Sequence, residues 1–374
     1  MDTTSAVPAQ GAGFNLELEA APLRAAVALC YATGDRRSTM PVLANVCVRH
    51  CGTVTTLEAT DLTVHVQARV AGAGAGEGAY TVPAKSLRDA LPKGKGKVPI
   101  AYNGNAHLTV AGTTLLGLPA SDYPAPPEQS RCLDSVERVA LLDLLSRTVA
   151  AVSTDVTRLH LGGVMLGNRA GHAVAVATDG HRLHLAERHC VLWPWLHDVL
   201  VPLRGVQVLL RALRADQAAR VEIGITKPAP WNLTVILTGC TINVRLLDER
   251  FPPYEMVVPT YFAGQAHVNR AELLAALEQC GKMANNHRVK IEAQSGKLRV
   301  SADNPDRGSA TAELECRVER QALQIGVNAR YLRDWLATCD QSRVTLEHEG
   351  YLSPLVVRPE GIEYEYAVVM PMRQ

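Results

Sequence analysis

No segment of the 374 residues approaches the roughly 18 uninterrupted apolar residues that a membrane-spanning helix requires, which excludes such a span. The opening stretch MDTTSAVPAQGAGF lacks a basic start followed by an apolar core, so we expect no secretory signal there. Without export, the nine cysteines, odd in number and irregularly spaced, are expected to be reduced thiols in a cytoplasm. A disulfide scaffold is therefore not predicted.

The chain also lacks an excess of charge of one sign. It has 38 Lys and Arg residues against 37 Asp and Glu residues, a net charge of only +1. A small DNA-binding domain is usually strongly basic overall. Net charge says nothing about distribution, so the positions of the basic residues decide whether nucleic acid is a plausible partner.

Three patterns recur at intervals of about 120 residues. They predict three copies of one domain, spanning 14–128, 129–259 and 260–374, after a disordered tail at 1–13. The patterns are VPAKSLRDAL, VPLRGVQVLL and VNARYLRDWL from Val82, Val201 and Val327; LEAAPLRAAV, VERVALLDLL and VNRAELLAAL from Leu18, Val136 and Val268; and strand-like segments that contain Asp61, Asp179 and Asp303.

Each copy shows alternating apolar and polar residues typical of strands, at Val64–Val70, Val174–Leu185 and Leu298–Ala302. Each copy also contains two predicted helices, one near its start and one near its middle. The sequence therefore predicts an α+β fold in which every repeated domain packs two helices against antiparallel sheet.

The six predicted helices carry more basic than acidic residues. A solvated face explains this on any single helix, but the same bias on all six favours a concentrated positive field. The basic residues are Arg24, Lys85, Arg88, Arg138, Arg147, Arg204, Arg211, Arg214, Arg270, Lys282, Arg330 and Arg333.

Several segments then resemble one known family. ATDGHRL (Ala177–Leu183), RFPPYEMVVP (Arg250–Pro259) and VVMPMRQ (Val368–Gln374) are similar to segments of the bacterial DNA polymerase III beta subunits, the sliding clamps. The resemblance also includes TMPVLANV and DVTRLHLGGVML, and it extends from Phe14 to the last residue in the family's order.

The resemblance implies three sliding-clamp (DNA clamp) domains per chain and a head-to-tail homodimer that closes into a ring lined by helices. It implies a non-catalytic processivity factor without cofactor or metal, which encircles double-stranded DNA irrespective of sequence. The implied partners are the replicative polymerase alpha subunit, the clamp loader, and other polymerases and repair proteins with clamp-binding peptides. The implied location is the cytoplasm, at the nucleoid during replication.

The resemblance also implies two sets of site residues. DNA contacts would come from Arg24, Arg36, Arg37, Arg158 and Arg204. A partner-peptide cleft between the second and third domains would consist of Leu161, Thr178, Gly180, His181, Arg182, Leu183, Pro252, Met256, Val257, Asn328, Tyr331, Val368, Val369, Met370, Pro371, Met372 and Arg373.

The sequence departs from the family pattern in several places. Met256 stands where a basic residue is common and Gln374 where leucine is common, and both departures would shift partner preference. The segment Lys282–Arg288 is shortened, which leaves one part of the cleft unassigned. Thr113 and Lys282 fall near the expected subunit interface, where more apolar side chains were expected, so the sequence leaves the strength of the dimer open.

Other motifs favour structural roles. His181 and His184, with His189 and Cys190 beyond, could suggest a metal site, but on one strand an odd separation would place the first two on opposite faces. The glycine-rich run Gly72–Gly78 has no following helix, which favours a flexible hairpin over a dinucleotide loop. The three recurring aspartates are interpreted as turn-stabilising acids, not as a catalytic cluster.

Two alternatives to the ring clamp remain at this stage. One is an accessory or mobile-element-encoded repeat scaffold that binds clamp-motif peptides without encircling DNA. The other is a hydrolase or metal enzyme that uses His181 and its neighbours. The basic helices favour the ring over the scaffold, and the absence of a convergent acid, base or metal set in the sequence disfavours the enzyme.

Overall fold

The computed structural model describes residues 13–104, 107–130, 133–189, 193–195, 197–226 and 231–372. Most of the predicted tail at 1–13 lies outside this part, as do Cys190, Arg373 and Gln374. The chain forms two compact units: Met1–Arg138 with Arg204–Leu246, and Val139–Leu203 with Leu247–Gln374. None of the helices in the described part of the chain has the length and hydropathy of a bilayer span.

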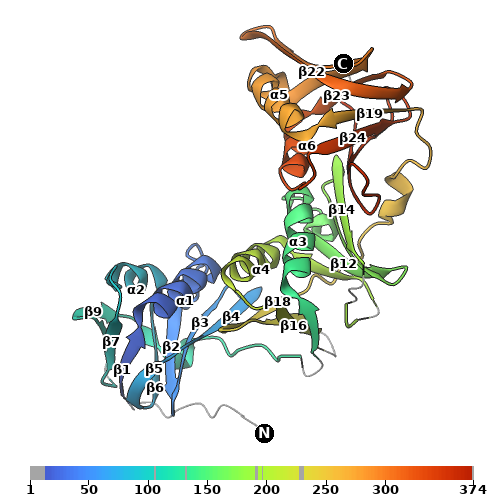
Figure 1. Cartoon of the computed structure of the whole chain (residues 1–374). Coiled ribbons are helices and arrows are strands. Elements are labelled where there is room, and N and C mark those ends of the chain that lie inside the picture. The colour runs from blue at the N-terminus through green and yellow to red at the C-terminus, as the bar shows by residue number, and fades with distance from the viewer. Residues whose placement is uncertain are drawn as a thin grey trace. The chain divides into compact units, whose positions relative to one another are not determined.

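The described residues of the first unit form two antiparallel sheets and three α-helices (Figure 1). One sheet has the order β5-β1-β7-β8-β9 and the other β10-β6-β2-β3-β4-β18-β17-β16-β11. The helices are α1 (Ala20–Thr33), α2 (Ala84–Ala90) and α4 (Leu203–Ala215). The strands are β1 (Phe14–Glu19), β2 (Asn45–Cys51), β3 (Val54–Thr60), β4 (Val64–Val70), β5 (Gly72–Gly76), β6 (Gly78–Pro83), β7 (Lys97–Tyr102), β8 (His107–Val110), β9 (Thr113–Leu116), β10 (Leu118–Pro119), β11 (Asp134–Glu137), β16 (Arg220–Ile225), β17 (Asn232–Ile236) and β18 (Cys240–Arg245).

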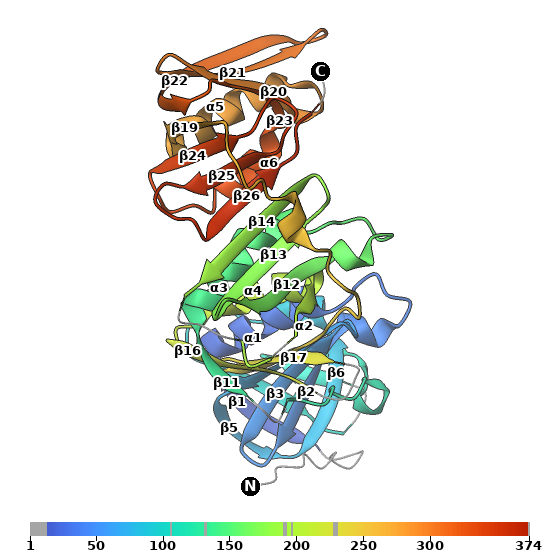
Figure 2. The ribbon, with the colours of Figure 1, turned by 90° about the vertical axis from the view of Figure 1, so that its right-hand side faces the viewer.

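The second unit has one twelve-stranded sheet system in the order β15-β12-β13-β14-β26-β25-β24-β19-β22-β21-β20-β23 (Figure 2). Its helices are α3 (Arg138–Thr148), α5 (Arg270–Met283) and α6 (Ala329–Leu336). The strands are β12 (Gly163–Arg169), β13 (His172–Thr178), β14 (Arg182–Arg188), β15 (Val199–Pro202), β19 (Gly264–Asn269), β20 (Arg288–Gln294), β21 (Lys297–Asn304), β22 (Gly308–Arg320), β23 (Leu323–Asn328), β24 (Arg343–His348), β25 (Leu355–Pro359) and β26 (Glu365–Val369).

The six α-helices of the described residues confirm the predicted pair per repeat. In the first helix of each repeat, three fully or nearly fully buried residues follow the same spacing of four and then three positions, which places them on one helical face. They are Leu23, Val27 and Cys30 in α1, Leu141, Leu145 and Thr148 in α3, and Leu273, Leu277 and Cys280 in α5. In the second helices, Leu87, Val206 and Leu332 are equivalent and have no exposed surface.

The middle repeat is divided between the two units because each of its outer strands continues a neighbouring repeat's sheet. β18 pairs with β4, with Val244 opposite Val64, in the first unit. β14 pairs with β26, with Leu183 opposite Val368, in the second unit. The boundaries predicted from the repeats remain a prediction.

Two predicted elements differ from the structure. The strand predicted at Val174–Leu185 is a hairpin, because β13 ends at Thr178 and β14 begins at Arg182. The glycine-rich run is not a flexible hairpin, since Gly72–Gly76 forms β5 and pairs with β1. Glycine is favoured at this edge because a Cβ atom on Gly74 would lie 2.9 Å from the backbone carbonyl oxygen of Asn15, which cannot move aside. The predicted strands at Val64–Val70 and Leu298–Ala302 are confirmed.

Candidate functional site

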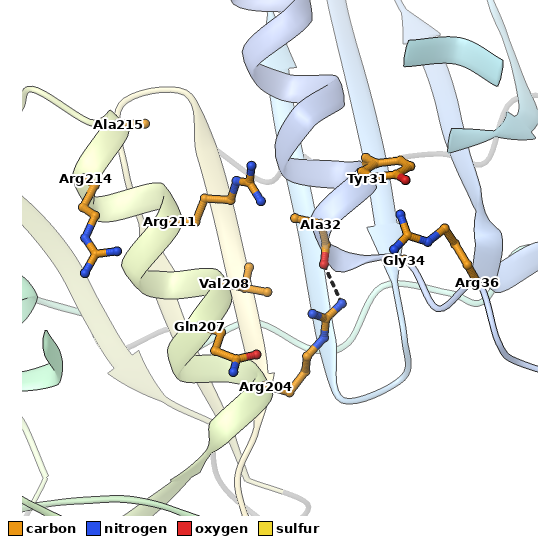
Figure 3. Close-up of a pocket in the computed structure, with 10 residues that line it drawn as sticks. All are labelled: Tyr31, Ala32, Gly34, Arg36, Arg204, Gln207, Val208, Arg211, Arg214 and Ala215. Carbon is orange, nitrogen blue, oxygen red and sulfur yellow. Dashed lines mark hydrogen bonds between the residues drawn. The ribbon is translucent and has the colours of Figure 1, made fainter. Parts of the chain in front are cut away.

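A basic groove runs between the C-terminal end of α1, the loop that follows it, and one face of α4, all within the first unit (Figure 3). It encloses about 790 Å³ and its lining is rich in guanidinium groups, unlike the mainly apolar lining of a small-molecule pocket. The lining residues are Tyr31, Ala32, Gly34, Arg36, Arg204, Gln207, Val208, Arg211, Arg214 and Ala215.

The spacing of α4 explains why four polar side chains share the groove. Arg204, Gln207, Arg211 and Arg214 are separated by three, four and three residues, which places them on one helical face. The opposite face is buried, with Leu209 at 1% and Leu213 at 0% exposure. The helix is therefore amphipathic, and its polar face consists largely of arginine.

Three of the groove's arginines are exposed and carry no ion pair with any described residue: Arg36, Arg211 and Arg214. Figure 3 shows Arg211 extending from α4 into the space between α4 and α1. Unneutralised guanidinium groups bind phosphate oxygens through charge-assisted, often bidentate hydrogen bonds. The groove is therefore suited to a polyanionic backbone.

Arg204 differs from these three because hydrogen bonds within the protein hold its guanidinium group, and its predicted contact with DNA stays a prediction. Its Nε donates to Asp61 Oδ2 at 2.9 Å, and its Nη2 donates to the carbonyl oxygens of Ala32 at 2.5 Å and Thr33 at 2.7 Å. These carbonyls lie at the end of α1, where the helix dipole is negative. Arg204 therefore joins α4 to α1 and to the turn after β3.

Arg204→Ala is expected to lower the free energy of unfolding by about 1–2 kcal/mol, because three charge-assisted hydrogen bonds are lost at a half-exposed position. Arg211→Ala, which removes no such bond, is the matched control and should melt like the unmodified protein. Urea unfolding of both variants measures the difference. Equal midpoints for the two variants would contradict the structural role of Arg204.

The other predicted DNA contacts are in different surroundings. Arg24 Nη1 donates to the carbonyls of Pro92 and Gly94, so this residue fastens the loop after α2. Arg158 is exposed and pairs with Asp155 at 3.5 Å. Arg37 is exposed next to Arg36 in the loop after α1. The groove thus contains Arg36 and Arg204 from the predicted set, while sequence analysis assigned no site role to Arg211, Arg214, Gln207 or Tyr31.

The six helices also offer fewer free basic side chains than their sequences indicate, because several of these side chains are engaged within the fold. Arg147 is only 3% exposed and contacts the carboxylates of Asp143, Asp340 and Glu365. Arg138 and Arg270 donate to backbone carbonyls. Arg147 is therefore neutralised by carboxylates, and the guanidinium groups of Arg138 and Arg270 are engaged in hydrogen bonds that stabilise the fold.

The residues predicted to form a peptide cleft all belong to the second unit. Five of them, Thr178 and Gly180 to Leu183, lie at the hairpin between β13 and β14. Thr178 Oγ1 donates to the carbonyl of Arg182 and accepts from the Gly180 amide. Asp179 Oδ1 accepts from the amides of His181 and Arg182. Gly180 has φ of +87°, a value that glycine adopts without strain. This turn exposes Gly180 and His181 to solvent.

The first repeat contains the same turn. Thr60 Oγ1 donates to the carbonyl oxygen of Val64 and accepts from the Leu62 amide. Asp61 Oδ1 accepts from the amides of Thr63 and Val64. The interpretation of Asp61 and Asp179 as turn-stabilising acids is confirmed. In the third repeat the turn acceptor is Asn304, the last residue of β21, whose Oδ1 accepts from the Asp306 amide. Asp303 pairs with Ser309 in the ladder between β21 and β22, so the interpretation is wrong for Asp303.

The C-terminal segment lies beside the turn between β13 and β14. Leu183 pairs with Val368, and the Met370 amide donates to the His181 carbonyl at 2.9 Å. The Met372 amide donates to the Gly326 carbonyl at 2.8 Å, next to the end of β23. Met370, Pro371 and Met372 are half-buried. The structure therefore brings together two predicted cleft segments that are about 190 residues apart.

A small apolar cluster supports this region. It contains Leu183 and Val368, and the linker that contains Phe251, Tyr254 and Val258 packs on it. Pro252, Met256 and Val257 lie on the same linker, and the Met256 side chain is 82% exposed. The cluster thus places the linker against Val368, two residues before Met370. An exposed apolar linker side chain in this region is suited to a short extended peptide.

Several predicted cleft residues are not directly accessible. Val369 has no exposed surface and packs in the core of the last repeat, and Leu161 is 6% exposed. Arg182 is 8% exposed and binds Asp179 and Asp334, while its guanidinium lies 4.5 Å from the ring centroid of Tyr331. These buried residues would hold the exposed residues of the turn and the linker in place. Asn328 caps α6 by accepting from the Arg330 amide, and Arg373 lies outside the described residues.

The histidines at and after the hairpin lie in different surroundings. His181 lies in the exposed turn and not on a strand, while His184 has no exposed surface and packs against Trp335. Burial, together with the nearby Arg182 charge, lowers the pKa of His184 to about 3. Among the residues that the structure describes, no group of three or more His, Cys, Asp or Glu side chains is arranged to hold a metal ion.

Comparison with known proteins gives a consistent result. Family models of the DNA polymerase III beta subunit match the chain in three consecutive parts: the N-terminal domain at 15–127, the central domain at 135–253 and the C-terminal domain at 255–373. The beta sliding clamp of Pseudomonas putida is 31% identical over 350 residues, which cover 91% of this chain and 94% of that protein.

Solved structures agree with the sequence matches. The DNA polymerase III subunit beta of Pseudomonas aeruginosa superposes with a TM-score of 0.87 at 29% identity, over 96% of this chain and all of that one. The sliding clamp of Bartonella birtlesii superposes with a TM-score of 0.89 at 26% identity, over 97% of this chain and all of that one.

Proposed function

The chain belongs to the DNA polymerase III beta subunit family, the beta sliding clamps, and we propose that it encircles duplex DNA as a processivity factor. The family consists of non-catalytic polymerase III subunits. The observation that carries the proposal for this chain is the groove with Arg36, Arg211 and Arg214, which form no ion pair with any described residue. Such cations attract phosphates of any sequence, which a sliding protein requires.

We propose that two copies assemble head to tail, since three domains per chain would need a second copy to close a ring. The domains are proposed to span 14–128, 129–259 and 260–374. Encirclement, and not contact strength, then keeps the protein on DNA. A polymerase held by the ring meets the primer end again at high effective concentration, which is the physical basis of processivity.

The proposed partner site is the surface formed by the turn at Gly180 and His181, the linker at Met256 and the tail from Met370 to Met372. Its apolar side chains and polar rim suit the short peptides of the polymerase alpha subunit, the clamp loader and other replication or repair proteins. The location that follows is the cytoplasm, at the nucleoid. Retention on closed circular DNA compared with linear DNA tests the function.

The scaffold alternative, a clamp-like protein that binds peptides without encircling DNA, makes a different prediction. It would not need unpaired arginines on α4, and it would show no topological retention. The enzyme alternative is disfavoured because His184 is buried and His181 lies apart from it in the turn.

A further inference from the structure

The ring of Tyr31, near the end of α1, is in contact with the guanidinium groups of two arginines. The Cζ atom of Arg36, from the loop after α1, lies 4.2 Å from the ring centroid. The Cζ atom of Arg88, from α2, also lies 4.2 Å from it. Both distances are within the range of a cation–π contact, so the ring connects the loop, α1 and α2 through side chains alone.

The two guanidinium groups are not equivalent in charge. Arg88 donates from Nε and Nη2 to Asp89 Oδ1, at 3.1 Å and 2.9 Å, so its charge is neutralised locally. Arg36 has no acidic partner among the described residues. The assembly of Arg36, Tyr31, Arg88 and Asp89 therefore has a net positive charge, and that charge belongs to Arg36.

The backbone on both sides of Arg36 is also ordered. The Gly34 amide donates to the Cys30 carbonyl at the end of α1, and the Arg37 amide donates to Asp35 Oδ1. Arg36 is exposed and lines the groove together with Tyr31 (Figure 3). An exposed arginine normally loses rotamer freedom when it binds a ligand, but stacking on a ring restricts it beforehand and leaves its N–H edge free.

We propose that the Arg36–Tyr31–Arg88 stack is a phosphate-binding site, in which Arg36 contacts one backbone phosphate of DNA and Tyr31 is the positioning residue. Arg88, neutralised by Asp89, supports the ring from α2. The proposal rests on the proposed function of the groove. It adds a contact that depends on an aromatic ring, which the basic character of the groove alone does not require.

The test is binding of the full-length protein to a short fluorescent duplex of arbitrary sequence, measured by anisotropy at several salt concentrations. Arg36→Ala should reduce the slope of log affinity against log salt by about 0.9, the value for one phosphate contact. Tyr31→Leu should weaken binding about threefold to fivefold at low salt, because Arg36 keeps its charge but loses its preferred position. Tyr31→Phe retains the ring and should bind like the unmodified protein.

In the background of Arg36→Ala, Tyr31→Leu should have no further effect, since no guanidinium remains to be positioned. Equal losses in Tyr31→Phe and Tyr31→Leu would overturn the proposal, as would an additive double variant or unchanged binding in Arg36→Ala. Circular dichroism and thermal melting show whether each variant is folded. Arg36→Gln repeats the test of the charge with a polar side chain and leaves Tyr31 in α1 unchanged. If these variants bind normally while Arg211→Ala weakens binding, the stack proposal fails alone. If Arg211→Ala also binds normally, the proposed function of the groove fails.

Discussion

Replacing Arg211 and Arg214 together by glutamate is expected to weaken binding of duplex DNA by at least about 100-fold at low salt, without unfolding the protein. Both side chains are exposed and form no ion pair within the described part of the chain, and charge reversal turns two attractive contacts into repulsive ones. The salt slope should fall by about 1.8, because two phosphate contacts no longer release counterions. Anisotropy titrations over a range of salt concentrations measure both quantities.

A matched control reverses two charges on another surface. Arg299 and Arg317 are exposed on β21 and β22, on the face of these strands opposite the buried Leu298 and Leu314. Arg299→Glu with Arg317→Glu changes the net charge equally and should reduce DNA affinity much less. Equal losses in the two double variants would mean that only net charge matters, and the groove would not be the DNA-binding surface.

Deleting Met370–Gln374 is expected to reduce the affinity for a clamp-binding peptide by at least about 50-fold. The deletion removes the half-buried Met370, Pro371 and Met372, which form the apolar side of the proposed cleft. Anisotropy with a labelled peptide that contains glutamine and leucine anchors measures the loss. DNA affinity should be unchanged, since the groove is formed by α1 and α4 in the other unit.

The competing explanation is that the tail only caps the sheet. The amides of Met370 and Met372 each donate one backbone hydrogen bond, so the deletion should lower the melting temperature slightly under either explanation. The explanations differ in peptide binding. A truncated protein that melts earlier but binds the peptide with unchanged affinity would contradict the cleft assignment, including His181 and Leu183.

The sequence was sufficient for the architecture because the repeat leaves a regular trace. The buried Leu23, Leu141 and Leu273 recur at equivalent positions of α1, α3 and α5, and any model that buries one face of each helix must bury them. The turn at Asp61 was predictable from its copy at Asp179 for the same reason. Local patterns repeated at one interval predict local structure well.

The sequence could not predict which arginines are free to bind a ligand, because their acidic partners lie far away in the chain. Arg204 and Arg211 look alike in α4, yet Arg204 binds Asp61, 143 residues away, whereas Arg211 binds no described residue. Arg147 is neutralised in part by Asp340, 193 residues away. The spacing of Arg204, Gln207, Arg211 and Arg214 could have identified the polar face of α4, but not which of its arginines is free.

The prediction for the glycine-rich run was wrong for a related reason. Gly72–Gly76 has no apolar alternation, so nothing in its pattern predicts a strand. Its pairing with β1 depends on the space that the side chains of Leu16 and Leu18 leave at that edge. Such a requirement is visible only once both strands are placed.

The central claim is that the protein stays on DNA by encircling it. The direct measurement loads the full-length protein onto nicked circular plasmid with a clamp loader, isolates the complex by gel filtration in high salt, and then linearises half of the sample with a restriction enzyme. We predict that the protein remains on the circles and is lost from the linear molecules, because it can slide off their ends. Equal retention on circular and linear DNA, or loss from both at the same rate, would contradict the claim.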